Sequence, residues 1–295
     1  MKKILLASAA LVSLTGAAMA EVAVSGDGRM GIIYDGTDWD FTSRIRITFT
    51  ATGETDGGLA FGGSVRADNA GVTGCTDFVA GDCGSLTKGG VAGAGGSVYI
   101  SGAFGKLSMG DVDSAAEAAI GQVSGVGLTG LGDMNEIGYL GAGASDSDPV
   151  LLYTYSSGDF TVYASLSDGN PNESYGVAFK YAPGNYSVSL GYEDNTTDSQ
   201  IVVGGSATFG DATISAVYSS HDLANMDEYA LSLDYVFGAA TVTAFYHGVD
   251  NAANDNFYGL GASYDLGGGA SIVGGVVSGD NMADPIMDFG ISMTF

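Results

Sequence analysis

Six basic residues carry the most usable chemistry in this chain: Arg29, Arg44, Arg46, Arg66, Lys106 and Lys180. Each falls out of phase with an alternating series of apolar residues, as Arg44 and Arg46 do with Ile45 and Ile47. In an extended strand, residues of opposite phase point to opposite faces. All six basic side chains should therefore lie away from the apolar face, and we predict that they form the basic wall of a constriction. Arg29, Arg44, Arg46 and Arg66, on three consecutive predicted strands, should be its clustered part.

Five acidic residues in or beside the segment 111–148 could complement that cluster: Asp111, Asp113, Glu117, Asp133 and Glu136. If the segment folds toward the arginines, these carboxylates would face them across a narrow aperture and create a transverse field, as charged rings do in selective pores. With a Debye length of about 8 Å at physiological ionic strength, the field would be confined to the aperture. The alternative is that the acids only decorate a solvated loop.

The histidines and cysteines give little support to catalysis. His221 and His247 are the only histidines, and both fall on or near predicted strand ends beside acidic residues, where polar lumen or rim positions explain them. Cys75 and Cys83 are the only cysteines, and in an exported chain they would pair. A metal or redox pair would need histidine partners or CxxC spacing. We therefore predict a disulfide and no enzymatic activity.

The N-terminus reads as an export signal. Lys2 and Lys3 precede an apolar run that closes on the small-residue triplet ending at Ala20, so residues 1–20 are expected to be removed as a signal peptide. The remainder keeps 7 of the 9 basic residues against 34 acidic ones, a formal charge of −27. Nucleic acid is therefore not an expected partner. With 45% hydrophobic and 10% aromatic residues, the chain is too apolar to be disordered.

Period-two alternation in segments of about ten residues predicts an all-β protein. One face of each segment is apolar and often ends in aromatic rings, such as Tyr186 with Tyr192 and Tyr229 with Tyr235, while small polar residues occupy the other face. Rings at both strand ends suit the two headgroup zones of a bilayer. The predicted strands span 22–35, 39–52, 59–67, 96–104, 106–111, 149–156, 159–168, 173–182, 185–194, 199–209, 211–221, 227–237, 239–249, 255–266, 269–279 and 285–295.

An even set of 16 strands can close without a free edge, which lipid requires because unpaired backbone groups there are costly. The prediction is a transmembrane antiparallel 16-stranded β-barrel across 21–295, wide enough to hold water. Tight turns alternate with longer links, and two regions break the pattern. Residues 68–95 are read as an external loop carrying Cys75 and Cys83, and residues 111–148 as a structureless insert folded into the lumen as a constriction.

Several stretches resemble the general-diffusion porins of α-proteobacteria, the Rhodobacter type. They include Glu21-Val22 with Ser25-Gly26-Asp27, the run SGAFGK at 101–106, the run PVLLYTYS at 149–156 and the run YGLGASYDLGGGASIVGG at 258–275. The resemblance covers most of the mature chain. It implies a homotrimer of 16-stranded barrels in outer-membrane lipid, an inward third external loop, and calcium ions at acidic sites near that loop. No other cofactor is implied, and no calcium ligands can be assigned by residue.

The expected function is passive diffusion of small hydrophilic solutes and ions, with a weak cation preference because acids at the mouths should concentrate cations. A solute-specific channel is the nearest alternative, although inward Tyr163 and Phe245 do not form an aromatic series. An outer-membrane hydrolase and a secreted soluble β protein are more distant alternatives. The first needs a catalytic histidine, and the second predicts solubility without detergent.

Overall fold

The computed structural model describes residues 21–68, 92–142, 150–167, 173–222, 226–250 and 255–295. Sixteen strands lie in these ranges: β1 Glu21–Tyr34, β2 Trp39–Glu54, β3 Ala60–Asp68, β4 Ala92–Gly102, β5 Gly105–Gly110, β6 Val150–Ser157, β7 Phe160–Ser167, β8 Ser174–Tyr181, β9 Tyr186–Asp194, β10 Ser199–Phe209, β11 Ala212–His221, β12 Met226–Phe237, β13 Ala240–Asp250, β14 Asp255–Gly267, β15 Ala270–Gly279 and β16 Ile286–Thr294. The strand count agrees with the sequence pattern, and the boundaries differ by a few residues.

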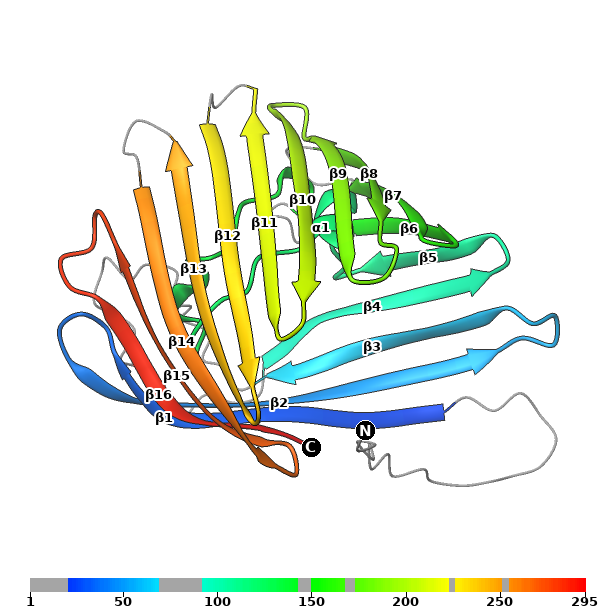
Figure 1. Cartoon of the computed structure of the whole chain (residues 1–295). Helices are drawn as coiled ribbons and strands as arrows, with labels where there is room; N and C mark the ends of the chain where they lie inside the picture. Colours follow the sequence, from blue (N-terminus) through cyan, green and yellow to red (C-terminus); the bar gives the residue numbers. More distant parts are fainter. Residues whose placement is uncertain (1–20, 69–91, 143–149, 168–172, 223–225, 251–254) are drawn as a thin grey trace.

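The strands form one closed antiparallel barrel (Figure 1). Each strand pairs with its neighbours in sequence, and β16 returns to pair with β1 through a register that opposes Met30 to Ile291 and Tyr34 to Met287. Closure leaves no strand of the ring with an unpaired edge, so the backbone donors and acceptors of the wall satisfy one another.

The outer face of the barrel is apolar. Along most strands, large exposed hydrophobic side chains alternate with covered residues; Leu190, Leu231 and Leu260, for example, are exposed, while their inward neighbours Ser189, Ser232 and Gly261 are buried. A soluble protein buries such side chains, whereas a membrane barrel turns them toward acyl chains. The alternation therefore has the inside-out sense expected from the sequence.

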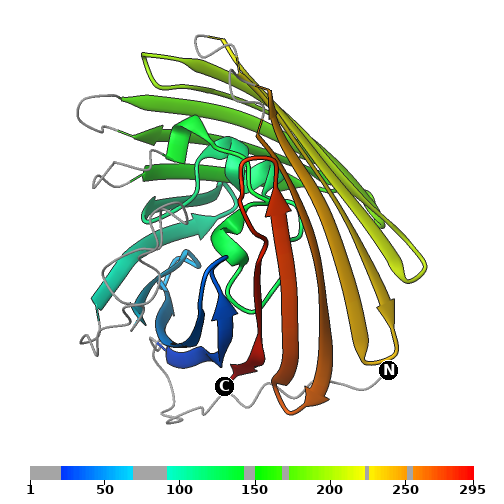
Figure 2. The ribbon, with the colours of Figure 1, turned by 90° about the vertical axis from the view of Figure 1, so that its left-hand side faces the viewer.

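The segment after β5 lies within the ring of strands, which the side view makes visible (Figure 2). It contains the short helix α1 Ala115–Ile120 and two 3-10 turns, η1 Leu131–Asp133 and η2 Leu140–Ala142. Ser114 caps α1 by accepting the Glu117 N–H, and Gly121 ends it at φ 71°, a conformation that favours glycine. We call residues 111–142 the insert. It is not structureless, which corrects one expectation.

The other interruption is shorter than expected. The sequence pattern predicts a loop over the whole of 68–95. In the structure, Asp68 ends β3 and residues 92–95 belong to β4. Cys75 and Cys83 lie outside the described residues, as do the predicted signal peptide and residues 143–148 of the predicted insert. Within the described ranges, no helix is long and apolar enough to cross a membrane.

Candidate functional site

Four arginines gather on the inner wall of β1–β3. Arg29 and Arg44 are directly opposed in the β1–β2 register, and Arg46 is opposed to Asp27 on one side and Asp68 on the other. Arg66 follows on β3, two residues before Asp68. The strand pairing thus assembles the predicted cluster, because residues of one phase on adjacent strands share a face. We call Arg29, Arg44, Arg46 and Arg66 the arginine wall.

The acids that pair with the arginine wall come from the strands as well as from the insert. Arg46 Nη2 lies 2.9 Å from Asp27 Oδ1, and Arg66 Nε lies 3.8 Å from Asp68 Oδ2. The predicted compensation lies in the insert alone and does not include these two aspartates. Their phase along β1 and β3, the same as that of the arginines, was the available signal.

Arg29 is the arginine that contacts the insert. Its Nη1 donates to the carbonyls of Leu128 and Thr129 at 3.4 and 3.3 Å. Asp133 of the insert and Asp288 of β16 also lie near its guanidinium. The insert therefore approaches the arginine wall through backbone carbonyls and one of its predicted acids.

The two lysines lie apart from this cluster. Lys106 is the second residue of β5, and its Nζ lies 4.5 Å from the centre of the Tyr99 ring, a cation–π geometry. Lys180 on β8 lines a cavity of about 160 Å³ beneath the insert, together with the hydroxyl-bearing residues Ser187, Ser189, Ser206 and Ser215. The structure thus brings together four of the six predicted basic residues.

The predicted acids of the insert are close enough to perturb one another. Burial raises the pKa of Glu117 to about 7, and the nearby charges of Asp113, Glu193 and Glu136 add to the effect. Burial also raises the pKa of Asp113, with Asp111 contributing, and that of Glu136, with Asp133 contributing. The acids of the insert thus form a chain of like charges, in which burial and neighbouring carboxylates both oppose ionisation of Asp113, Glu117 and Glu136.

Apolar packing seats the insert on the inner wall. Val123 and Ile137 pack against Val202, Val217 and Ala230 of β10–β12 in one buried cluster. Val126 and Leu131 pack against Val277, Ile286 and Phe245 in a second. Inward Phe245 and Tyr163, which had no explanation in the sequence, contact the insert in the second cluster and in a third around Ala115 and Ala119.

Inward glycines give the insert room to lie flat on the wall. A Cβ added to Gly204 would come within 2.4 Å of Ile120 Cγ2, and one on Gly191 within 2.6 Å of Ala116 Cβ. On the opposite wall, a Cβ on Gly275 would lie 2.6 Å from the backbone nitrogen of Gly127. Each distance is below normal contact, so a side chain at these positions would displace the insert. Part of the high glycine content therefore has a local reason.

Two buried carboxylates bind backbone N–H groups of the insert. Glu193 on β9, which is fully buried, accepts from Ala116 N at 3.0 Å and from Gly141 N at 2.7 Å. Asp288 on β16 accepts from Leu128 N at 2.8 Å, and from the nitrogen and hydroxyl of Thr129 at 2.6 and 2.8 Å. These bonds satisfy orphan donors of a non-strand segment: Glu193 holds the insert near both of its chain ends, and Asp288 holds its middle.

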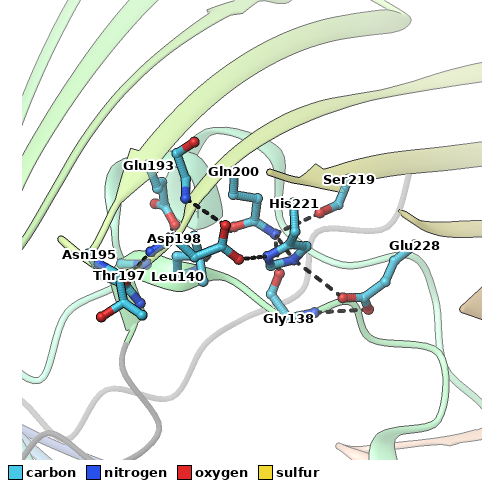
Figure 3. Close-up of polar contacts among 12 residues, drawn as sticks. Gly138, Leu140, Glu193, Asn195, Thr197, Asp198, Gln200, Ser219, His221 and Glu228 are labelled. Atoms are coloured by element: carbon cyan, nitrogen blue, oxygen red, sulfur yellow. Dashed lines mark hydrogen bonds and ion pairs between the residues drawn. The ribbon is translucent and has the colours of Figure 1, made fainter. Parts of the chain in front are cut away.

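A polar network lies beside Glu193 (Figure 3). Gln200 donates to Gly138 O at 2.6 Å and accepts from Leu140 N at 3.0 Å, so one side chain binds two backbone groups of the insert. His221 Nδ1 lies 3.2 Å from Asp198 Oδ2, and Glu228 accepts from Gly138 N at 3.3 Å. Alternation along β9 and β16 assigns Glu193 and Asp288 to the polar faces of these strands, but it does not connect any of these residues to the insert.

Comparison with known proteins agrees with this architecture. The family model described as Gram-negative porin matches residues 7–284. A porin of Rhodobacter capsulatus is 39% identical over 318 residues, covering 93% of this chain and all of that protein, and a porin of Fuscovulum blasticum is 28% identical with the same coverage. A solved porin structure superposes on this chain with a TM-score of 0.78 and 38% sequence identity. A mutant of Rh. blastica porin superposes with a TM-score of 0.72 and 27% identity. Each match covers 93% of this chain and 100% of the other chain. The chain belongs to the Gram-negative porin family.

Proposed function

We propose that this protein forms a water-filled pore through which small hydrophilic solutes and ions diffuse passively across the outer membrane of a Gram-negative bacterium. The observation that carries the proposal is the closed barrel of 16 strands with apolar side chains outside and the arginine wall inside. A barrel of this size is too wide for wall side chains to fill. The relatives are named porins, which are channels rather than enzymes, and we expect no catalytic activity.

The constriction is proposed to lie between the insert and the arginine wall. Arg29, Arg44, Arg46 and Arg66 would supply the positive side, and Asp111, Asp113, Glu117, Asp133 and Glu136 the negative side. The proximity of Asp133 to Arg29 and the carboxyl chain on the insert support this arrangement. Lys106 and Lys180 would line the vestibule and not the aperture, since neither joins the arginine wall.

A weak cation preference is proposed for the pore as a whole. The mature chain would carry −27 formal charges, and acids at the mouths raise the local cation concentration even where the aperture is lined by both signs. Part of the arginine charge is already offset by Asp27 and Asp68. The cation preference should be modest, because dissolved salt screens the charges of the protein beyond about 8 Å at physiological ionic strength.

Solute uptake into proteoliposomes tests the diffusion proposal. Neutral sugars and amino acids of increasing size should enter at rates that fall smoothly with size, without saturation. A solute-specific channel would instead give saturable uptake of one solute, and a soluble β protein would not insert. Unchanged permeability of the vesicles would overturn the proposal.

Assembly and export remain proposals. We infer a homotrimer in outer-membrane lipid after removal of residues 1–20, with a disulfide between Cys75 and Cys83. A shallow apolar groove on the outside of β2–β4, lined in part by Phe49, Phe61, Gly63, Val65 and Val98, supports subunit contact there. Light scattering of the detergent-solubilised protein should give the mass of three mature chains, and a monomer mass would contradict the trimer.

The family resemblance implies calcium ions at acidic sites near the insert. In the described ranges, no group of three or more histidine, cysteine or acidic side chains is arranged to hold a metal ion. Calcium ions at acidic sites of the insert are proposed without assigned ligands, and diffusion is proposed to require no cofactor.

A further inference from the structure

The cavity beneath the insert, on the inner wall of β8–β11, combines one cation with several hydrogen-bond donors. Its volume is about 160 Å³, which is enough for several water molecules or a small ion. Lys180 supplies its charge, and its other polar side chains are Gln122, Ser187, Ser189, Ser206 and Ser215. No acid is among the described residues that line it, although the chain has 34 acidic residues against 9 basic ones. We call this cavity the lysine–serine niche.

Strand pairing explains why these side chains converge on neighbouring strands (Figure 1). Ser206 on β10 is opposed to Ser187 on β9 and to Ser215 on β11, so three hydroxyl groups form one row. Lys180 on β8 is opposed to Ser189, the next inward residue of β9 after Ser187. Directly opposed residues on one face have Cβ atoms about 4.5–5.5 Å apart. The ammonium group therefore lies beside one end of the row of hydroxyls.

Lys180 has no counter-ion within the part of the chain that the structure describes. Its side chain is half-buried, and in the same ranges its ammonium group makes neither an ion pair nor a hydrogen bond. In contrast, Arg46 pairs with Asp27, and Lys106 lies over the ring of Tyr99. A partly desolvated charge without a partner attracts an opposite charge from solution more strongly than a fully hydrated one does.

The hydroxyl and amide groups of the niche also keep hydrogens that no other group accepts. Ser187 Oγ and Ser206 Oγ lie 3.0 Å apart and share one hydrogen bond, so one of their two hydrogens remains unused. Gln122 Nε2 donates one hydrogen to Ile137 O at 2.9 Å and has a second. Ser215 Oγ has no partner among the described residues. A negatively charged ligand with several acceptor oxygens matches these donors.

Neighbouring groups do not occupy these donors. Ser189 Oγ donates to Ala119 O at 2.9 Å, so its own hydrogen is used and it offers the niche only lone pairs. Asp234, an inward acid of β12, accepts from Ser124 Oγ at 2.7 Å and from Thr243 Oγ1 at 2.6 Å, and it is not part of the lining. The donors of the niche are therefore available to a ligand.

We propose that the lysine–serine niche binds a small tetrahedral oxyanion, either inorganic phosphate or the phosphate group of a small solute. Lys180 neutralises the charge, and the spare hydroxyl and amide hydrogens are donated to the oxygens. These donors come from β8, from β9–β11 and from the insert. A tetrahedral anion has an oxygen for each of these directions, whereas a planar carboxylate presents both of its oxygens on one side. Ile120 and Val217 complete the lining with apolar surface, which strengthens the electrostatic attraction.

The niche lies on the side of the barrel where the tight turns are. Lys180 is the second-to-last residue of β8, just before the short link 182–185 to β9. Short turns face the periplasm in bacterial barrels. If the proposed function holds, a phosphate-bearing solute that has passed the constriction meets the niche next. The niche thus gives a pore with an overall cation preference a separate place for one class of anion.

Binding of inorganic phosphate to the detergent-solubilised protein tests the niche without a conducting pore. At constant ionic strength, the phosphorus NMR signal of phosphate should broaden in the presence of wild-type protein, and the effect should saturate. Lys180→Gln should weaken this binding about tenfold or more, because the only charge of the niche is lost. Lys106→Gln is the matched control: it also removes one basic side chain of the inner wall, and it should retain wild-type binding.

Ser215→Ala separates a built site from general attraction to positive charge. This change keeps every charge and removes a hydroxyl group that has no partner among the described residues, so it should leave the barrel intact. We expect phosphate binding about three- to tenfold weaker than in wild type. Full binding in Lys180→Gln, or equal losses in Lys180→Gln and Lys106→Gln, would overturn the proposal, and so would wild-type binding in Ser215→Ala.

The effect on conductance rests on the proposed function, whereas the binding result does not. In planar bilayers, added phosphate should lower the single-channel conductance of the wild type saturably, and it should have a much smaller effect on Lys180→Gln. Specific phosphate binding by a protein that forms no channels would support the niche and reject the proposed function. Channels that conduct without any specific phosphate binding would do the reverse.

Discussion

Removing the carboxylate of Glu193 should free the insert near both of its chain ends while leaving the barrel intact. Glu193 is fully buried and binds two N–H groups, Ala116 at 3.0 Å and Gly141 at 2.7 Å. Hydrogen bonds to charged groups contribute roughly 1.5–3 kcal/mol each, so Glu193→Ala should cost about 3–6 kcal/mol of insert attachment. Glu193→Gln keeps one acceptor and removes the desolvation of a buried charge, so we expect a smaller cost of about 1–2 kcal/mol.

The assay is amide exchange measured separately on the insert and on the strands. A loss of 3 kcal/mol corresponds to an increase of about a hundredfold in local opening, which should appear at amides 115–121 and 140–142. Glu54→Ala, at the exposed end of β2, is the charge-matched control and should leave the insert protected. Unchanged protection in Glu193→Ala, or an equal loss across the strands, would refute the assignment of Glu193 as an insert attachment.

Three further predictions concern packing, pH and selectivity. Gly204→Ala should weaken the insert by about 1–3 kcal/mol because the new methyl lies 2.4 Å from Ile120 Cγ2, whereas Gly28→Ala, which meets nothing nearer than 3.5 Å, should be almost neutral in exchange. Burial raises the pKa of Glu117 to about 7, so the attached insert binds this proton more tightly than a detached insert does. As the pH drops through about 7, attachment of the insert should therefore strengthen and the cation preference of the pore should fall. Reversal potentials should show this step in the wild type and not in Glu117→Gln. Neutralising Arg44 and Arg46 together should increase cation preference, and unchanged selectivity would place them away from the constriction.

The barrel was predictable from the sequence because each strand carries its own signal. Alternation such as that of 227–237 fixes which side chains face outward, and closure follows from an even strand count. The phase of Arg44 and Arg46 predicts their face, and three consecutive strands predict that they meet Arg29. These inferences use only local periodicity and nearest-neighbour pairing.

The contacts that hold the insert on the inner wall were not predictable in the same way. Its contacts join residues far apart in the chain, such as Leu128 with Asp288 and Ala116 with Glu193. Periodicity shows that Asp288 points inward but not which backbone group it meets. Inward glycines were visible in the strands, and they are the one signal that could have marked the path of the insert, because small residues on a wide inner wall indicate close approach of another backbone.

Single-channel recording in a planar lipid bilayer tests the central claim most directly. The account predicts discrete, ohmic conductance steps with a reversal potential that shows a weak cation preference in a salt gradient. Purified protein that enters the bilayer without any conductance would contradict a water-filled barrel, and a firm anion preference would contradict the proposed balance of charge at the aperture.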